Sequence, residues 1–126
     1  MLLPLEDLTS LFKALSDPTR LRLVNVLRVQ SLCVGDLQVV LSLSQPMISR
    51  HLAVLRSTKL VRAERLGSRI CYSLSRAPFL SYPLGRFLSE VGPFFPELAA
   101  DNEKLADYKG DSLSCLESEE ETARAG

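Results

Sequence analysis

The chain has 126 residues, 46% of them hydrophobic and 24% charged, with a formal net charge of zero. This length and composition suit one compact domain with one hydrophobic core. No apolar run approaches the roughly 18 residues that a membrane span needs, and the first residues carry no basic segment typical of a signal peptide. We therefore expect a cytoplasmic protein that is neither inserted into a membrane nor secreted.

The cysteines are odd in number and far apart in the sequence: Cys33, Cys71 and Cys115. Such spacing does not suit a disulfide framework, and it fits a reducing cytosol. We expect three free thiols.

The neutral total conceals an uneven distribution of charge. Residues 1–86 carry twelve Lys or Arg against five Asp or Glu, a net charge of +7, and residues 87–126 carry three against ten, a net charge of −7. Between residues 44 and 76 a single acidic residue, Glu64, stands among Arg50, Arg56, Lys59, Arg62, Arg65, Arg69 and Arg76. This concentration of positive charge is typical of a phosphate-binding surface.

Apolar spacing and capping residues predict the first two helices. The first ends near Ser16, and its apolar stripe consists of Leu5, Leu8, Phe12 and Leu15. Asp17 can accept hydrogen bonds from the first turn of a second helix, and Pro18 suits a position that needs no amide donor. This second helix should run to about Val29 at the buried centre of the domain, because apolar side chains cover most of its circumference.

A short third helix is predicted from about Cys33, and a fourth over residues 44–59 after a brief turn. Ser44 caps the fourth helix and Pro46 lies in its first turn. On a helical wheel one stripe is formed by Ile48, Leu52, Leu55 and Lys59, whereas Arg50 lies opposite and Gln45, Ser49 and Arg56 lie on a flank. The apolar stripe belongs to the core, and the polar faces are accessible.

After residue 60 the period of the pattern changes from 3.6 to 2. Alternation on both sides of a turn at Gly67 predicts a β-hairpin. A helical stripe then follows Pro78, is interrupted over residues 92–96 and resumes through residues 98–108, as one kinked helix or as two. Residues 109–126 are acidic and almost without apolar side chains, which predicts a disordered tail beyond a domain over residues 1–108.

This order of elements predicts a mainly α fold with a small β-hairpin wing, the winged helix-turn-helix. Residues 44–59 are then the reading helix, whose N-terminal residues reach base edges in a DNA major groove about 12 Å wide. Gln45, Ser49 and Arg50 are the candidates for bases, although ordinary helix-start chemistry explains the first two nearly as well.

Other residues of the same region are candidates for the DNA backbone. Ser44 and His51 are expected at phosphates, with Arg56 also in the contacting set. His51 is equally suited to fill the buried edge of the helix. In the hairpin, Arg65 and Arg69 flank the turn and should both lie at the wing tip, within reach of the minor groove or its phosphates.

Three segments resemble the signature of the ArsR/SmtB metalloregulatory repressors. They are Leu-Ser-Asp-Pro-Thr-Arg-Leu-Arg over residues 15–22, Leu-Cys-Val-Gly-Asp-Leu over 32–37 and Ser-Gln-Pro-Met-Ile-Ser-Arg-His-Leu over 44–52. The resemblance extends from about Leu5 to Leu105. It implies a homodimer, paired through the first and last helices, that binds a double-stranded operator and is released by an inducer. The apolar stripes of those helices suit a dimer face, with half-sites about one turn of DNA apart.

The resemblance also raises the question of which inducer the protein binds. Arsenite repressors of this family carry Cys-Val-Cys-Asp-Leu at the start of the third helix, whereas here Gly35 replaces the second thiol. Because As(III) requires two or three thiolates and Zn(II) four ligands, Cys33 needs partners from elsewhere. We expect Cys115, with Cys71 as a weaker third, to complete a site for a thiophilic inducer such as trivalent arsenic.

Several alternatives remain beside that site. The same thiols could form a redox or persulfide switch, Cys71 could be a strand residue without chemistry, and the chain could belong to the family without a metal inducer. A zinc or nickel site on the last helix is not expected, because no histidine follows His51 and only Asp101 and Glu103 lie nearby. An enzyme is not expected either, since a single histidine offers no nucleophile with an orienting base. A winged domain can also bind proteins alone, but the charge on the reading helix and wing favours DNA.

Overall fold

The computed structural model describes residues 2–75, 78–108 and 115. Its elements are α1 (Leu5–Leu15), α2 (Pro18–Leu27), α3 (Val34–Leu41), α4 (Gln45–Ser57), β1 (Val61–Leu66), β2 (Arg69–Leu74), α5 (Pro78–Val91), η1 (Gly92–Phe94) and α6 (Pro96–Asp107). The predicted mainly α fold with one hairpin is confirmed. The expected acidic tail lies outside the described residues, apart from Cys115.

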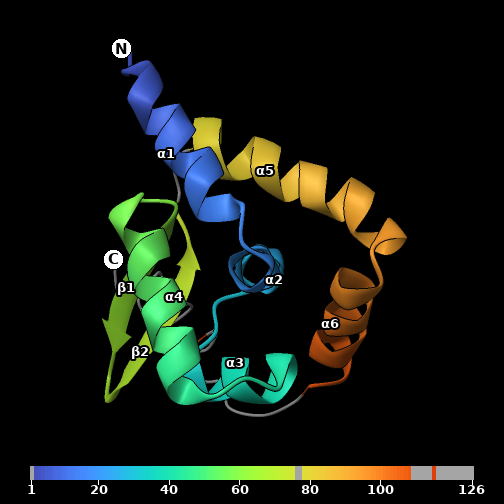
Figure 1. Cartoon of the computed structure of the whole chain (residues 1–126). Helices are drawn as coiled ribbons and strands as arrows, with labels where there is room; N and C mark the ends of the chain where they lie inside the picture. Colours follow the sequence, from blue (N-terminus) through green and yellow to red (C-terminus); the bar gives the residue numbers. More distant parts are fainter. Residues whose placement is uncertain (1, 76–77, 109–114, 116–126) are drawn as a thin grey trace.

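The second helix is the centre of the core, as its apolar circumference predicts. Figure 1 looks along α2, with the other helices arranged around it. Leu23, Val24 and Val26 are completely buried, and full burial of such a side chain contributes about 1.5–3 kcal/mol. The start of α2 is capped as expected, because the Asp17 carboxylate accepts a hydrogen bond of 3.0 Å from the backbone N–H of Arg20.

The hairpin is antiparallel, with Val61 opposite Leu74 and Leu66 opposite Arg69. Gly67 begins the two-residue connection with a φ of 64°, a conformation that is least costly for glycine at the first position of a tight hairpin turn. The hairpin is anchored to the segment before α3 because Leu32 and Tyr72 exchange backbone hydrogen bonds of 3.0 and 2.9 Å. The wing therefore has a fixed origin on the core.

The last helical region is two helices, which resolves the alternative left open by the sequence. The 3₁₀ turn η1 separates α5 from α6, and Phe95 then has extended angles of φ −116° and ψ 115°. A residue before proline is disfavoured in the helical region, so Pro96 forces the extended Phe95 and then suits the first turn of α6. The expected order of five helices thus gains a sixth.

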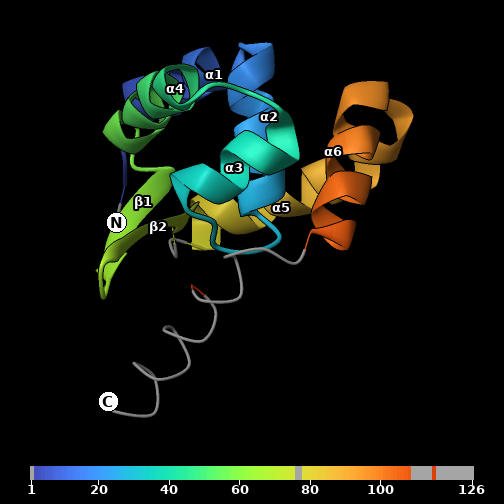
Figure 2. The same ribbon diagram turned by 90° about the horizontal axis from the view of Figure 1, so that it is seen from below.

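Polar contacts dock α6 against α2. The side-chain amide of Asn25, which is fully buried, donates to Asn102 Oδ1 at 2.9 Å. Arg22 donates to both carboxylate oxygens of Asp101, at 2.7 and 2.9 Å, and to the carbonyl of Leu41 at 2.9 Å. Figure 2 shows the result, with α6 on one side of α2 and the hairpin on the other. Within the described ranges, no helix has the length and apolar character needed to cross a bilayer.

Candidate nucleic-acid interface

The turn between α3 and α4 is short, and a side chain of α6 contacts it. α3 ends at Leu41 and is followed by Ser42, which has a left-handed φ of 55°. Ser44 caps α4 by accepting a hydrogen bond of 3.4 Å from the backbone N–H of Met47. Lys104 of α6 donates to Ser42 Oγ at 2.6 Å. The last helix thus supports the turn that sets the direction of α4.

α4 has one buried and one accessible face, as its periodicity predicts. Ile48, Leu52 and Leu55 are at most 1% exposed and pack into the core. The candidates Ser44, Gln45, Arg50 and Arg56 are exposed, and Ser49 is half-buried. Gln45 Nε2 donates to Ser49 Oγ at 2.9 Å, so these two side chains support one another at the start of the helix.

His51 lies on the buried side of α4, and the expectation that it contacts a phosphate is not met by its position. Its exposed fraction is 9%. The ring Nδ1 lies 3.2 Å from Arg20 Nη1 and 3.9 Å from the carboxylate of Asp17. The alternative suggested by the sequence, that His51 fills the buried edge of the helix, is the one observed.

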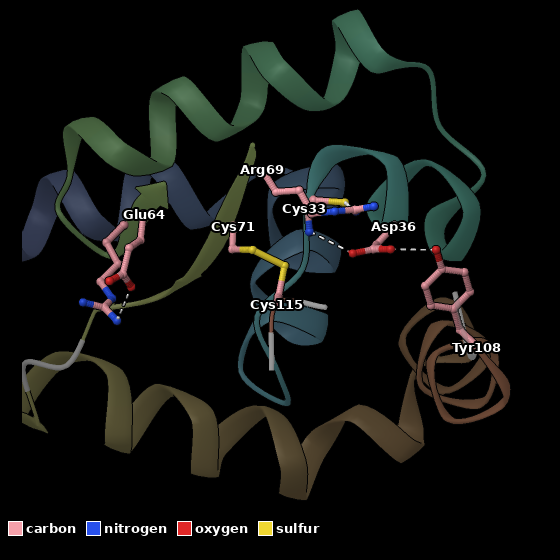
Figure 3. The surroundings of a disulfide bond; sticks show 8 residues. Cys33, Asp36, Glu64, Arg69, Cys71, Tyr108 and Cys115 are labelled. Atoms are coloured by element: carbon pink, nitrogen blue, oxygen red, sulfur yellow. Dashed lines mark hydrogen bonds and ion pairs between the residues drawn. A yellow bond between two sulfur atoms is a disulfide. The ribbon is translucent and has the colours of Figure 1, made fainter. Parts of the chain in front are cut away.

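The two wing arginines both lie beside the turn at the tip, as expected, but they project from different faces of the hairpin. Arg65 is opposite Ile70 in the hairpin and Arg69 is opposite Leu66. Because residues that are paired across strands share a face, the two arginines project from opposite faces. Arg65 is exposed. Arg69 is half-buried and turns toward α3, where its Nη1 lies 3.8 Å from Cys33 Sγ (Figure 3).

The expectation of three free thiols is wrong, because Cys71 and Cys115 form a disulfide (Figure 3). Cys71, on β2, is 2% exposed and Cys115 is fully buried. The two residues are 44 positions apart, a separation that does not by itself identify them as partners. Cys71 is therefore a disulfide partner and not a strand residue without chemistry. Cys115 is bonded to Cys71 rather than placed at Cys33.

Cys33 keeps a free thiol at the start of α3. Its backbone N–H donates to Asp36 Oδ2 at 3.0 Å, and the other oxygen of this buried carboxylate accepts from Tyr108 at 2.7 Å (Figure 3). Burial raises the pKa of the Cys33 thiol above its ordinary value, and the hydrogen bond from the backbone N–H of Asp36 offsets only part of this shift. At neutral pH this thiol is therefore protonated.

The expected three-cysteine site is not assembled. In the part of the chain that the structure describes, no three His, Cys, Asp or Glu side chains are grouped so that they could hold a metal ion. On α6, both carboxylate oxygens of Asp101 bind Arg22, so this side chain has a structural role. Cys71 and Cys115 could act as thiolate ligands only after reduction of the disulfide that joins them.

Two residues that tie elements together were not singled out from the sequence. Arg20 joins α2 to His51 of α4, a partner 31 positions away, and Tyr108 joins the end of α6 to Asp36, 72 positions away. Neither contact follows helical or strand periodicity. The capping motif at Asp17 marks the start of the helix that contains Arg20, but it does not indicate the contact with His51.

Comparison with known proteins gives consistent matches. The family profile described as "Bacterial regulatory protein, arsR family" matches residues 17–63. The SmtB-homologous transcriptional repressor of Synechocystis sp. is 41% identical over 70 residues, which are 56% of this chain and 53% of the relative. The arsenical resistance operon repressor of Escherichia coli K12 is 47% identical over 75 residues, 59% of this chain and 61% of the relative. The chain thus spans about half to three fifths of these two relatives.

A solved structure extends the match over more of the fold. The transcriptional repressor BigR from Xylella fastidiosa has a TM-score of 0.60 and 30% sequence identity, with 71% of this chain and 87% of that chain covered. Each of these three proteins is named as a repressor, in agreement with the expectation of a regulator rather than an enzyme.

Proposed function

Because this chain belongs to the ArsR family of bacterial regulatory proteins, we propose that it is a homodimeric transcriptional repressor that binds operator DNA through α4 and the wing. An inducer that reacts with its thiols releases the DNA. The domain is formed by residues 1–108, and Cys115 belongs functionally with it through the bond to Cys71.

The observation that carries DNA binding is the accessible face of α4. Its first turns present Gln45 and Arg50 to solvent, while Ile48 and Leu52 hold the opposite face in the core. Gln can pair with adenine and Arg with guanine through two hydrogen bonds each, and such a pair is worth about 1–3 kcal/mol of discrimination. Arg56 and Arg65 add positive charge for phosphates on either side.

Exposed apolar side chains support the homodimer. On α1, Leu5, Leu8 and Phe12 are 74%, 44% and 62% exposed, and on α5 Phe87 is 58% exposed. Figure 1 places α1 and α5 along one edge of the molecule, away from α3. A second copy that covered these helices would remove apolar surface from water and leave α4 of each subunit free.

Selection from a random library of DNA duplexes tests the proposal, because it identifies the operator sequence and the binding at the same time. We expect enrichment of an inverted repeat whose half-sites are about 10 base pairs apart, because two reading helices related by a twofold axis address successive turns. Sedimentation of the complex should give two protein chains per duplex. Binding without enrichment of any sequence would contradict a specific repressor.

For the inducer, we infer that trivalent arsenic is bound first by the thiols of Cys71 and Cys115 in the reduced protein. Reduction of the disulfide would leave two thiols side by side on neighbouring segments, and two thiolates that can separate to either side of a soft ion are suited to bind it. The name of the Escherichia coli relative, an arsenical resistance repressor, supports the same chemistry. Cys33 would have to move to become a third ligand.

A second candidate is favoured by the disulfide itself. A two-electron oxidant such as hydrogen peroxide would convert the two thiols of Cys71 and Cys115 into the S–S bond, with the two thiol hydrogens and the peroxide leaving as two water molecules. In this case the disulfide is the signal, and arsenite has no role.

Release of the selected duplex distinguishes the two inducers. Arsenite should release DNA from the reduced protein in the first case, and peroxide should do so in the second. Cys71→Ser should abolish whichever response is real, whereas Cys33→Ser keeps it under the two-thiol proposal. If Cys33→Ser loses the arsenite response and Cys71→Ser keeps it, the arsenic site lies at the start of α3 instead.

A further inference from the structure

Three helices are linked through Arg20. Its Nε donates to the carbonyl of Ala14, near the end of α1, at 2.6 Å. Its Nη1 lies 3.2 Å from Nδ1 of His51, in the middle of α4. Its backbone N–H donates to the Asp17 cap of α2 at 3.0 Å. One guanidinium thus bonds at the same time to the helix before it and to the helix that faces DNA.

The direction of the His51 side chain determines the direction of its neighbours on α4. Successive residues of an α-helix are about 100° apart around the axis. Arg50 immediately precedes His51, so when the imidazole is held against Arg20 the Arg50 side chain is directed outward, where it is exposed. A rotation of α4 that released His51 would turn Arg50 and Ser49 away from their present directions by the same angle.

We propose that Arg20 and His51 are positioning residues for DNA recognition, which fix the rotation of α4 about its axis and tie it to the end of α1. This inference rests on the proposed function, because it assigns a role within DNA binding. His51 then acts by positioning α4 and not by the phosphate contact expected from the sequence.

The same contacts connect the apolar face of α1 to the reading face. Leu8 and Phe12 are exposed on the helix whose Ala14 carbonyl accepts from Arg20. A partner subunit seated on that face would hold α1, and Arg20 would carry the restraint to His51 through two hydrogen bonds. Packed side chains and hydrogen bonds can carry energetic coupling between two sites, and here a single side chain contacts both helices.

The test compares variants that keep or remove the acceptor at His51. His51→Asn keeps a hydrogen-bond acceptor close to the position of Nδ1, and His51→Leu replaces it with an apolar side chain. Arg20→Met removes the donor, and Arg20→Lys keeps the positive charge with one nitrogen in place of three. Circular dichroism at the assay temperature establishes that each variant is folded, and sedimentation gives its oligomeric state.

Each variant is titrated with the duplex selected by the wild-type protein and with a scrambled duplex. We expect His51→Leu and Arg20→Met to bind the selected duplex at least about tenfold more weakly, the scale of one lost hydrogen bond to a charged group. Binding to the scrambled duplex stays unchanged, because the exposed arginines remain. His51→Asn recovers most of the specific affinity, and the double variant is no weaker than the worse single one.

Three results would overturn the inference. Equal losses on both duplexes, with a smaller dependence on salt, would make His51 a phosphate contact. Unchanged specific binding in both His51→Leu and Arg20→Met would show that the contact positions nothing, while the repressor proposal stands. If the wild-type protein selects no sequence, the repressor proposal falls and this inference falls with it.

Discussion

Arg22 of α2 and Asp101 of α6 form a two-pronged ion pair in which Nε lies 2.7 Å from Oδ2 and Nη2 lies 2.9 Å from Oδ1. The side chain of Asp101 is 6% exposed and that of Arg22 is 24% exposed. Because Arg22 also binds the carbonyl of Leu41 at the end of α3, this pair holds α6 against the part of the fold that supports α4.

Loss of that carboxylate should lower the free energy of unfolding. Asp101→Ala leaves a partly buried guanidinium without its partner, at a cost of roughly 1–3 kcal/mol. Urea denaturation measures the effect, with Glu103→Ala as the matched control because Glu103 is exposed on the same helix. Equal stability of the two variants would mean that the ion pair contributes nothing to the docking of α6.

The two wing arginines should differ in their effect on DNA affinity. Arg65→Ala removes an exposed charge and should reduce the slope of log K against log salt by about 1, as the loss of one phosphate contact does. Arg69→Ala should leave this slope unchanged, because Arg69 faces Cys33 from the other side of the hairpin. Fluorescence anisotropy over a range of salt gives both slopes, and the reverse order would contradict the hairpin register as the basis of the contact.

The disulfide should stabilise the oxidised protein. Cross-linking of residues 44 positions apart limits the unfolded chain, and bonds of this kind typically contribute about 2–4 kcal/mol. Thermal denaturation of wild-type protein without reductant should thus give a higher melting temperature than Cys115→Ser. Reductant should remove the difference, and Cys33→Ser should melt like the wild-type protein. A wild-type melting temperature that does not respond to reductant would exclude the bond in solution.

Alkylation of Cys33 should require a higher pH in the folded protein than in the unfolded chain. Burial raises the pKa of this thiol, and only the thiolate reacts, so the folded protein contains less of the reactive form at any given pH. The rate with iodoacetamide, measured without reductant, should reach half its maximum at a pH above the ordinary thiol value of about 8.5. The urea-unfolded chain is the control. A midpoint at or below the unfolded one would contradict a buried, protonated thiol.

Local signals in the sequence are sufficient for the helices and the hairpin. The fourth helix, expected over residues 44–59, is observed as Gln45–Ser57 with Ser44 as its cap, because caps and periodicity depend on neighbouring residues. The sequence does not decide between one and two helices after the wing, although the prolines that separate them are visible. Whether such a break bends a helix or ends it depends on how α6 packs.

Contacts between distant residues account for the rest. The inward direction of His51 depends on Arg20, the inward direction of Arg69 depends on the hairpin register and on Cys33, and the pairing of Cys71 depends on the return of the chain after α6. Residue type and spacing do not encode these partners. The errors at the candidate site therefore fall on side chains whose direction is set by tertiary contacts.

The most direct test of DNA reading by α4 is a second duplex selection carried out with Arg50→Ala. Arg50 is exposed on the accessible face of α4, and an arginine in this position pairs with guanine through two hydrogen bonds. We expect that the enriched inverted repeat keeps its spacing but loses its preference for guanine at one position in each half-site. An unchanged motif, obtained with unchanged affinity, would contradict the reading role of α4.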